Sequence, residues 1–212
     1  MSAIAMAFVL GAGIVVGCGV NDHGRTCPGS RGPNLSGRTL TGADLTHRPL
    51  RCANLERSTL DDQRLTEAKL SRANLHRASL RNVRLGNVDL SGADLTDADL
   101  EAATLDGVDL SGADLRRASL AGGATLTDVG MRRARLDAAD LSDAILKRSD
   151  LAHADLRGAN LAGAWLINSN LRGAKLDPDG LAETKWADAV CPDGRKSGGD
   201  PESCDGHLTP AP

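Results

Sequence analysis

Leucine recurs at every fifth position over most of the chain. The run from Leu35 to Leu120 holds 18 consecutive leucines at this spacing. After a shift of one residue the spacing continues from Leu126 to Leu176, with Met131 as the one exception. The residue two places before these 29 positions is mostly small: 18 are Ala, 4 are Val and 3 are Ser. Each five-residue unit therefore offers one bulky and one small apolar side chain.

A period of five fits neither an α-helix, which repeats about every 3.6 residues, nor a flat strand, which repeats about every 2. On a helix the leucines would advance by about 140° at each step and would spread around the axis. Short fixed periods are typical of solenoids, in which each unit buries its apolar side by stacking on its neighbours. We therefore predict a solenoid from about residue 33 to residue 180.

The recurring motif Ala-(Asp/Asn)-Leu-x-x resembles the pentapeptide-repeat family, and it is clearest in the two copies of Ser-Gly-Ala-Asp-Leu at residues 91–95 and 111–115. The resemblance implies an all-β fold: a right-handed quadrilateral β-helix with four units per coil. It also implies that the leucine and the small residue point inward and that the other three point outward. The 29 units, at four per coil, correspond to about seven coils. At about 4.8 Å per coil they form a rod roughly 35 Å long.

Composition agrees with such a fold and narrows the function. The 212 residues include one Phe, two Trp and no Tyr, which suits a core of identical small layers better than a conventional core. The unbroken repeat indicates one domain. The formal net charge of −3 comes from balanced acidic and basic residues, so we expect no nucleic-acid partner on electrostatic grounds.

The repeat has two irregular regions. The small inward position holds Pro33, Arg38, Arg48 and Gln63 in the first coils. Because an unpaired charge in an apolar interior is costly, we expect ragged first coils with the arginines at the open mouth, or else a polar site inside that mouth. The shift in spacing falls in the Ala-Gly-Gly-Ala of residues 121–124, which we interpret as a corner bulge, or alternatively as a functional loop.

The N-terminus indicates export. Residues 3–20 are almost wholly apolar and resemble a secretory signal. Their Val-Val-Gly-Cys ending resembles a bacterial lipobox, which implies cleavage before Cys18 and lipidation of its thiol. The segment before it lacks Lys and Arg, so a plain secretion signal or an uncleaved anchor of about 18 residues remain alternatives. We divide the chain into a signal or lipoprotein segment (1–20), a linker and cap (21–32), the repeat (33–180) and a C-terminal cap with a polar disulfide tail (181–212).

Four cysteines remain if Cys18 is lipidated, and four allow three pairings. The implied rod separates its ends by about 35 Å, whereas bridged Cα atoms lie about 5.5 Å apart. We therefore expect the disulfides Cys27–Cys52 and Cys191–Cys204, one at each end. Such bonds persist in oxidising compartments, which agrees with export. The tail also resembles the Trp…Cys-Pro-Asp-Gly…Cys tails of exported bacterial members of the family.

One apolar group falls on outward positions. Ile145 and Trp165 are 20 residues apart and should stack in successive coils, with Ile167 beside them. An exposed apolar patch usually marks a contact surface for a partner protein or a second copy of the chain. Alternatively, the tail that begins with Leu181 and Trp186 folds back over this patch.

Known family members that resemble DNA in shape and charge bind DNA gyrase and give quinolone resistance. The most acidic predicted side of this rod has a net charge of −5, and another side has a net charge of +3. Duplex DNA carries about one charge per 1.7 Å, or roughly 20 over this length, so the imitation would be poor.

No catalytic set is evident in the sequence. His47, His76 and His153 fall on three different sides, so they do not suggest a Ser–His–Asp arrangement. The sequence contains no Cys-x-x-Cys motif that would indicate a metal site. We expect no cofactor. The sequence predicts a non-enzymatic scaffold or protein-interaction module at the bacterial cell envelope, held at the membrane by its lipid or N-terminal anchor. A gyrase-binding DNA mimic and an enzyme of unrecognised type are the alternatives.

Overall fold

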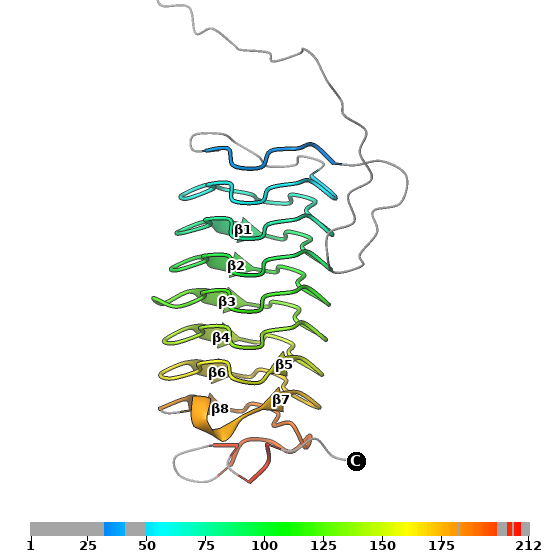
Figure 1. Ribbon diagram of the computed structural model, residues 1–212. Helices are drawn as coiled ribbons and strands as arrows, with labels where there is room; N and C mark the ends of the chain where they lie inside the picture. The colour runs from blue at the N-terminus through cyan, green and yellow to red at the C-terminus, as the bar shows by residue number, and fades with distance from the viewer. Residues whose placement is uncertain (1–31, 41–49, 182, 199–202, 205, 209–212) are drawn as a thin grey trace, which may run out of the picture.

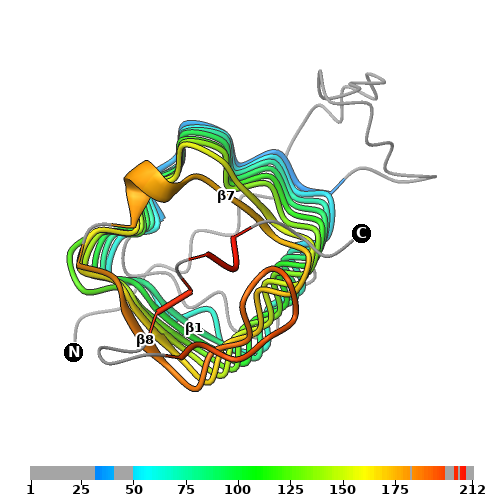
Figure 2. The same cartoon turned by 90° about the horizontal axis from the view of Figure 1, so that it is seen from below.

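The computed structural model is a stack of coils around one core (Figure 1). It describes residues 32–40, 50–181, 183–198, 203–204 and 206–208. Viewed along the stack, each coil has a four-sided outline and successive coils superpose (Figure 2). The expected all-β quadrilateral solenoid is therefore confirmed.

Short parallel strands build one side of the stack. In the order in which they pair, they are β1 (Arg84–Gly86), β2 (Thr104–Asp106), β3 (Thr125–Thr127), β4 (Ile145–Lys147), β6 (Trp165–Ile167) and β8 (Lys185–Ala187). A second side carries β5 (Asp155–Leu156) paired with β7 (Lys175–Leu176), and η1 (Pro178–Gly180) is a short 3-10 turn. Pairing such as that of Leu146 with Leu166 joins residues 20 apart, so four units make one coil.

The number of coils is close to the expected seven. The strands of the six-stranded sheet lie in successive coils and are separated by five coil-to-coil steps, which is slightly fewer than the expected seven coils. The first coils pair through isolated bridges instead of strands, as between Asn34 and Asn54 and between Asn54 and Asn74. Followed through such bridges, one column of paired residues runs from Asn34 to Lys175 in seven steps.

The leucines and the small residues two places before them form the core. Leu95 and Ala93, for example, have no exposed surface. The same segment is bonded to both neighbouring coils: the Leu95 amide donates to the Asp114 carbonyl at 2.7 Å, and the Asp94 amide donates to the Ala73 carbonyl at 2.9 Å. Stacking of the coils therefore gives the backbone groups their hydrogen-bond partners and at the same time buries the leucine. Burial of each leucine side chain stabilises the fold by roughly 1.5–3 kcal/mol.

Serine fits the small inward position because its hydroxyl finds a backbone acceptor. Ser58 Oγ donates to the Leu55 carbonyl at 2.7 Å. Ser149 and Ser169 donate in the same way to carbonyls of the preceding coil at 3.0 Å. A buried hydroxyl with a partner costs little, so these positions do not interrupt the core.

Left-handed backbone turns the chain at most corners. The second residue after the leucine has a positive φ even when it is not glycine, as at Asp97 (57°) and Arg117 (56°). This conformation is unfavourable for residues with a Cβ. Its recurrence shows that the pairing of coils on both sides outweighs the local backbone preference.

The shift in spacing is absorbed at a single corner, as the sequence predicts. Gly122 and Gly123 both have positive φ, at 68° and 77°. The coil that contains them is one residue longer, because Leu105 pairs with Leu126. Two glycines accept this geometry at little steric cost, and the inward leucines stay aligned.

Polar residues in the first coils are accommodated in two ways. Arg38 is exposed in the first described coil, in agreement with a position at the mouth. Gln63 is buried, and its Nε2 donates to the Asp61 carbonyl at 3.2 Å. Arg48 lies outside the described residues.

The coil continues past residue 180, where the sequence pattern places the end of the repeat. Trp186 in β8 pairs with Leu166 and is only 8% exposed. Cys191 follows Val190, which pairs with Asn170, so Cys191 stands in the same column as Leu171 and is fully buried. The tail thus supplies the last apolar layer of the core.

We expect Leu95→Ala to lower the free energy of unfolding by about 2–5 kcal/mol, because it leaves a cavity in a central layer. Urea denaturation of the full chain measures this. Thr104→Ala, at an exposed position of β2, is the matched control and should change the value by less than about 0.5 kcal/mol. Equal effects of the two changes would contradict the assigned core.

Deleting Gly123 should leave the fold intact and change the free energy of unfolding by less than about 1 kcal/mol. The deletion restores 20-residue spacing without moving a leucine out of its column. Deleting Gly112, at a regular corner, should be far more damaging, since it shifts polar residues toward the core. Circular dichroism and denaturation of the two variants compare them directly, and comparable damage would refute the bulge.

Candidate interaction surface

Two large apolar side chains are exposed on the six-stranded sheet. Ile145 in β4 is 36% exposed and Trp165 in β6 is 42% exposed. They are register partners, so they stack in successive coils. Ile167, also in β6, is half-buried on the same side. We refer to Ile145, Trp165 and Ile167 as the Trp165 wall.

Two lysines border the Trp165 wall. Lys185 in β8 is the register partner of Trp165, and its Nζ lies 4.2 Å from the centre of the indole ring. An ammonium group in this position is attracted to the ring face by about 0.5–1 kcal/mol. Lys147 in β4 is exposed and pairs in register with Ile167. The wall is therefore apolar with a cationic border.

The described part of the C-terminal segment extends the sheet instead of folding over the Trp165 wall. β8 adds one more parallel strand, and its Trp186 side chain faces the core. Lys185 reaches over the Trp165 ring and still leaves that residue 42% exposed. Among the described residues, the Trp165 wall is therefore accessible.

Charged residues at the corner beside the wall pair with one another. The Arg148 Nε donates to Asp128 Oδ1 at 2.7 Å, and Lys196 Nζ lies 3.1 Å from Asp188 Oδ1. The hydrogen bond from Arg148 lowers the pKa of Asp128. These two ion pairs therefore largely neutralise the charges at this corner.

The acidic residues before the leucines have a structural role. Asp99 Oδ1 accepts the Glu101 amide at 3.0 Å, and Asp109 Oδ1 accepts the Ser111 amide at 2.8 Å. Asn170 does the same with the Arg172 amide at 3.1 Å. Asp and Asn are suited to this contact because their short side chains reach the backbone two residues on. The recurring Asp/Asn of the motif therefore supports the turns.

On the side with an expected net charge of −5, several of the acidic side chains have hydrogen-bond partners. Asp61 Oδ1 accepts hydrogen bonds from Ser79 Oγ at 2.6 Å and from the Arg81 amide at 2.9 Å. The Arg81 guanidinium contacts Asp99 at 2.9 Å and Glu101 at 2.6 Å, and these contacts raise its pKa. A duplex carries about one uncompensated charge per 1.7 Å, and this side does not approach that density.

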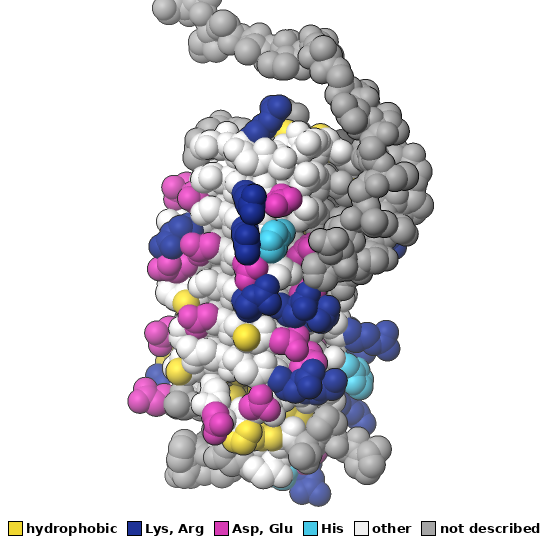
Figure 3. All heavy atoms as spheres, in the orientation of Figure 1, with side chains coloured by type: hydrophobic (Ala, Val, Ile, Leu, Met, Phe, Trp, Pro, Cys, Tyr) yellow, Lys and Arg dark blue, Asp and Glu magenta, His cyan; other side chains and the backbone are white. Residues whose placement is uncertain are grey.

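Acidic and basic side chains intermingle on the surface in view in Figure 3. Arg117 Nε donates to Asp97 Oδ1 at 2.6 Å, and Arg157 Nε donates to Asp155 Oδ1 at 2.8 Å. Each bond lowers the pKa of its carboxyl group. Exposed pairs of this kind contribute about 0–1 kcal/mol each, so they neutralise the surface more than they stabilise the fold.

One of the two expected disulfides is described in full. Cys191 and Cys204 are bonded, with Cα atoms 5.5 Å apart. Cys52 is also disulfide-bonded. Its expected partner Cys27 lies outside the described residues, as does the expected lipidation site Cys18.

The described residues hold no grouping of three His, Cys, Asp or Glu side chains that could bind a metal ion. His76 Nδ1 is 3.0 Å from the Thr96 carbonyl, and His207 Nδ1 is 2.7 Å from Asp193 Oδ2. These contacts are between a ring and a backbone group or a tail carboxylate. In the same part of the chain no helix has the length and apolar character needed to cross a bilayer.

The two tryptophans should respond oppositely to truncation. Trp165→Ala should change the free energy of unfolding by less than about 1 kcal/mol, because the ring is largely outside the core. Trp186→Ala should cost about 3–5 kcal/mol, since it empties the last layer. Urea denaturation of both variants tests the assignment, and a large loss at Trp165 would show that its ring has a structural role.

Sequence comparison relates the repeat to a known family. The family described as pentapeptide repeats matches with 8 copies, over residues 49–87, 64–97, 84–122 and 134–173. No curated protein sequence matches the chain.

Solved structures with the same kind of repeat are similar to the chain. HetL, a pentapeptide repeat protein involved in heterocyst differentiation regulation from the cyanobacterium Nostoc sp. strain PCC 7120, is 28% identical, with 77% of this chain and 89% of that chain covered and a TM-score of 0.39. Trypsin-treated QnrB1, a plasmid-mediated fluoroquinolone resistance protein, is 16% identical, with 75% and 77% covered and a TM-score of 0.49. Because the family match extends over more than half of the sequence, the chain belongs to the pentapeptide-repeat family.

Proposed function

We propose that the protein is a non-enzymatic scaffold at the bacterial cell envelope, and that it binds a protein partner through the Trp165 wall. The observation that carries the proposal is the exposure of Ile145 and Trp165 on the six-stranded sheet, in a stack whose leucines from Leu50 to Leu176 are buried. Aromatic side chains such as Trp165 are enriched in binding hot spots, because they bury much area at low entropic cost.

The size of the wall indicates the kind of contact. The three strands β4, β6 and β8, at about 4.8 Å per strand and with a width of three residues, give an area on the order of 150 Å². A standard protein interface buries about 800 Å² on each partner. The wall is therefore the centre of a larger contact that extends to its lysine border, or it binds weakly and reversibly, as suits a scaffold.

The proposed location rests on the N-terminus and on the disulfides. Residues 3–20 resemble a signal with a lipobox ending at Cys18. The Cys191–Cys204 bond is of a kind that persists in oxidising compartments. Both observations favour export, and the lipobox-like ending favours attachment to the membrane.

Site-specific photo-crosslinking in cells tests the binding surface. A photoreactive amino acid at position 165 should give a discrete crosslinked product. The same group at position 104, which is exposed on β2 of the same sheet, is the matched control and should not. Mass spectrometry of the product distinguishes a different protein from a second copy of this chain. Equal crosslinking at both positions, or none at 165, would contradict the proposed surface.

Metabolic labelling with palmitate tests the proposed anchor. The wild-type protein should incorporate the label and sediment with membranes, whereas Cys18→Ser should remain unlabelled, because the acceptor thiol is missing. Labelling that persists in Cys18→Ser would refute lipidation at this residue.

Inhibition of gyrase supercoiling by the purified protein would favour the DNA-mimic alternative over the envelope scaffold.

A further inference from the structure

The tail closes the C-terminal end of the coil stack. In Figure 2 the red C-terminal segment runs across the end of the four-sided outline. Cys204 is 1% exposed and belongs to the core cluster, and Leu208 packs against the same cluster. We refer to residues 192–208, as far as they are described, as the strap.

The strap pairs with the last coil in the opposite direction to every coil before it. Lys196 forms an antiparallel bridge with Val190, whereas Val190 pairs in parallel with Asn170. The Ser197 amide donates to the Ala189 carbonyl at 2.7 Å, and the Cys191 amide donates to the Arg195 carbonyl at 2.7 Å. The strap thus occupies the edge at which a further coil would otherwise stack, and an occupied edge resists unwanted pairing.

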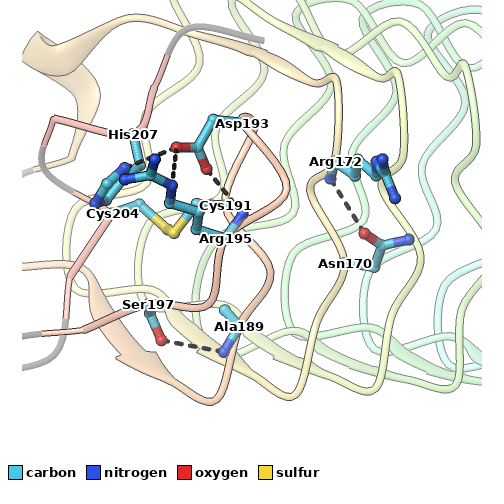
Figure 4. Close-up of a disulfide and its surroundings, with 9 residues drawn as sticks. All are labelled: Asn170, Arg172, Ala189, Cys191, Asp193, Arg195, Ser197, Cys204 and His207. Carbon is cyan, nitrogen blue, oxygen red and sulfur yellow. Dashed lines mark hydrogen bonds and ion pairs between the residues drawn. A yellow bond between two sulfur atoms is a disulfide. The ribbon is translucent and has the colours of Figure 1, made fainter. Parts of the chain in front are cut away.

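The disulfide and several hydrogen bonds tie the far half of the strap to its near half. Gly198 and Ser203 form an antiparallel bridge, in which the Ser203 amide donates to the Gly198 carbonyl at 2.9 Å and the Gly198 amide donates to the Ser203 carbonyl at 3.1 Å. Asp193 Oδ2 lies 2.7 Å from His207 Nδ1, and the Asp193 amide donates to the His207 carbonyl at a long 3.3 Å (Figure 4). The hydrogen bond from the Arg195 amide lowers the pKa of Asp193; burial opposes this shift, and the contact with His207 adds to it. These contacts are partly exposed, so the covalent bond is the strongest link.

The strap also contacts the strand that borders the Trp165 wall. Lys196 pairs with Asp188, one residue beyond β8. Ser197 bonds to Ala189 in both directions, since its Oγ accepts the Ala189 amide at 3.2 Å. β8 carries Lys185, whose ammonium group lies over Trp165. Release of the strap would therefore free the outer edge of the coil that supports Lys185.

We propose that the Cys191–Cys204 disulfide locks the strap, and that its reduction releases the strap from the coil end and loosens β8 beside the Trp165 wall. The release of the strap is independent of what the wall binds. Its effect on binding rests on the proposed function of the wall.

The proposed reductant is a dithiol, which supplies the two electrons that reduction of the disulfide consumes. One of its thiolates attacks a sulfur of the disulfide, and the other cysteine leaves as a thiolate that takes up a proton. The second reductant thiol then displaces the mixed disulfide, so the reductant is oxidised to a disulfide and Cys191 and Cys204 become thiols. Both cysteines are buried, so the attack follows a transient opening of the strap. In an oxidising compartment the strap stays closed.

Hydrogen exchange of the full-length protein before and after dithiothreitol tests the proposal. The Ser197 amide is bonded to the Ala189 carbonyl of the last coil, and the Ser203 amide is bonded to the Gly198 carbonyl of the strap. Both should exchange on the order of 100-fold faster after reduction, because the disulfide closes a short loop. The Lys185 amide, bonded to the Ala164 carbonyl at 2.7 Å, should also speed up. The Leu95 amide in the central coils should not change.

Cys204→Ser separates this bond from the disulfide of Cys52, which the reductant also breaks. The variant should show the same faster exchange without reductant, and trypsin should cut it after Arg195 and Lys196. Unchanged Ser197 protection would overturn the lock, and unchanged Lys185 protection would overturn its link to the wall. Loss of protection at Leu95 would also overturn it, because the bond would then support the whole stack. None of these hydrogen-exchange and proteolysis measurements needs a binding partner. They therefore test the strap, whereas crosslinking at position 165 tests the proposed binding surface.

Discussion

The packing of one leucine over one small residue on each side of every coil is the constraint on which the structure depends. It buries Leu95 and Ala93 completely while the neighbouring backbone bonds to the coils on both sides. Neither the core nor the sheet exists without the other, since a single coil has nothing to cover its leucines or to pair with its amides. This dependence explains why twenty corner residues other than glycine hold an unfavourable positive φ in the described chain.

The same constraint limits where function can reside. Two of the five positions in each unit are inside, and the acidic position before the leucine is often engaged in the turn, as at Asp99 and Asp109. Charged residues that remain outside are frequently paired across coils, as Arg117 is with Asp97. Against this neutralised surface the Trp165 wall stands out, because its exposed apolar area serves neither the core nor a turn.

The period of five was sufficient to predict the solenoid, the inward leucines and the bulge at Gly122 and Gly123, because each follows from keeping one column aligned. The Trp165 wall could be located for the same reason: Ile145 and Trp165 are 20 residues apart. The left-handed corners could not be predicted, because their cost is outweighed by pairing between coils that the local sequence does not reveal. Lys185 is not part of the predicted patch, although it follows Trp165 by the same 20 residues. Cys191 keeps the five-residue spacing of Leu181 and Trp186, which marks it as a core position.

The 20-residue register makes the length of this protein adjustable in discrete steps. A duplicated coil inserted between Asn74 and Thr104 would restore every column and leave both ends of the stack as they are. Each insertion would move the Trp165 wall away from Asn34 by about 4.8 Å. The distance between a binding surface and the N-terminal end of the stack can therefore change during evolution by whole coils, without any change in the surface itself.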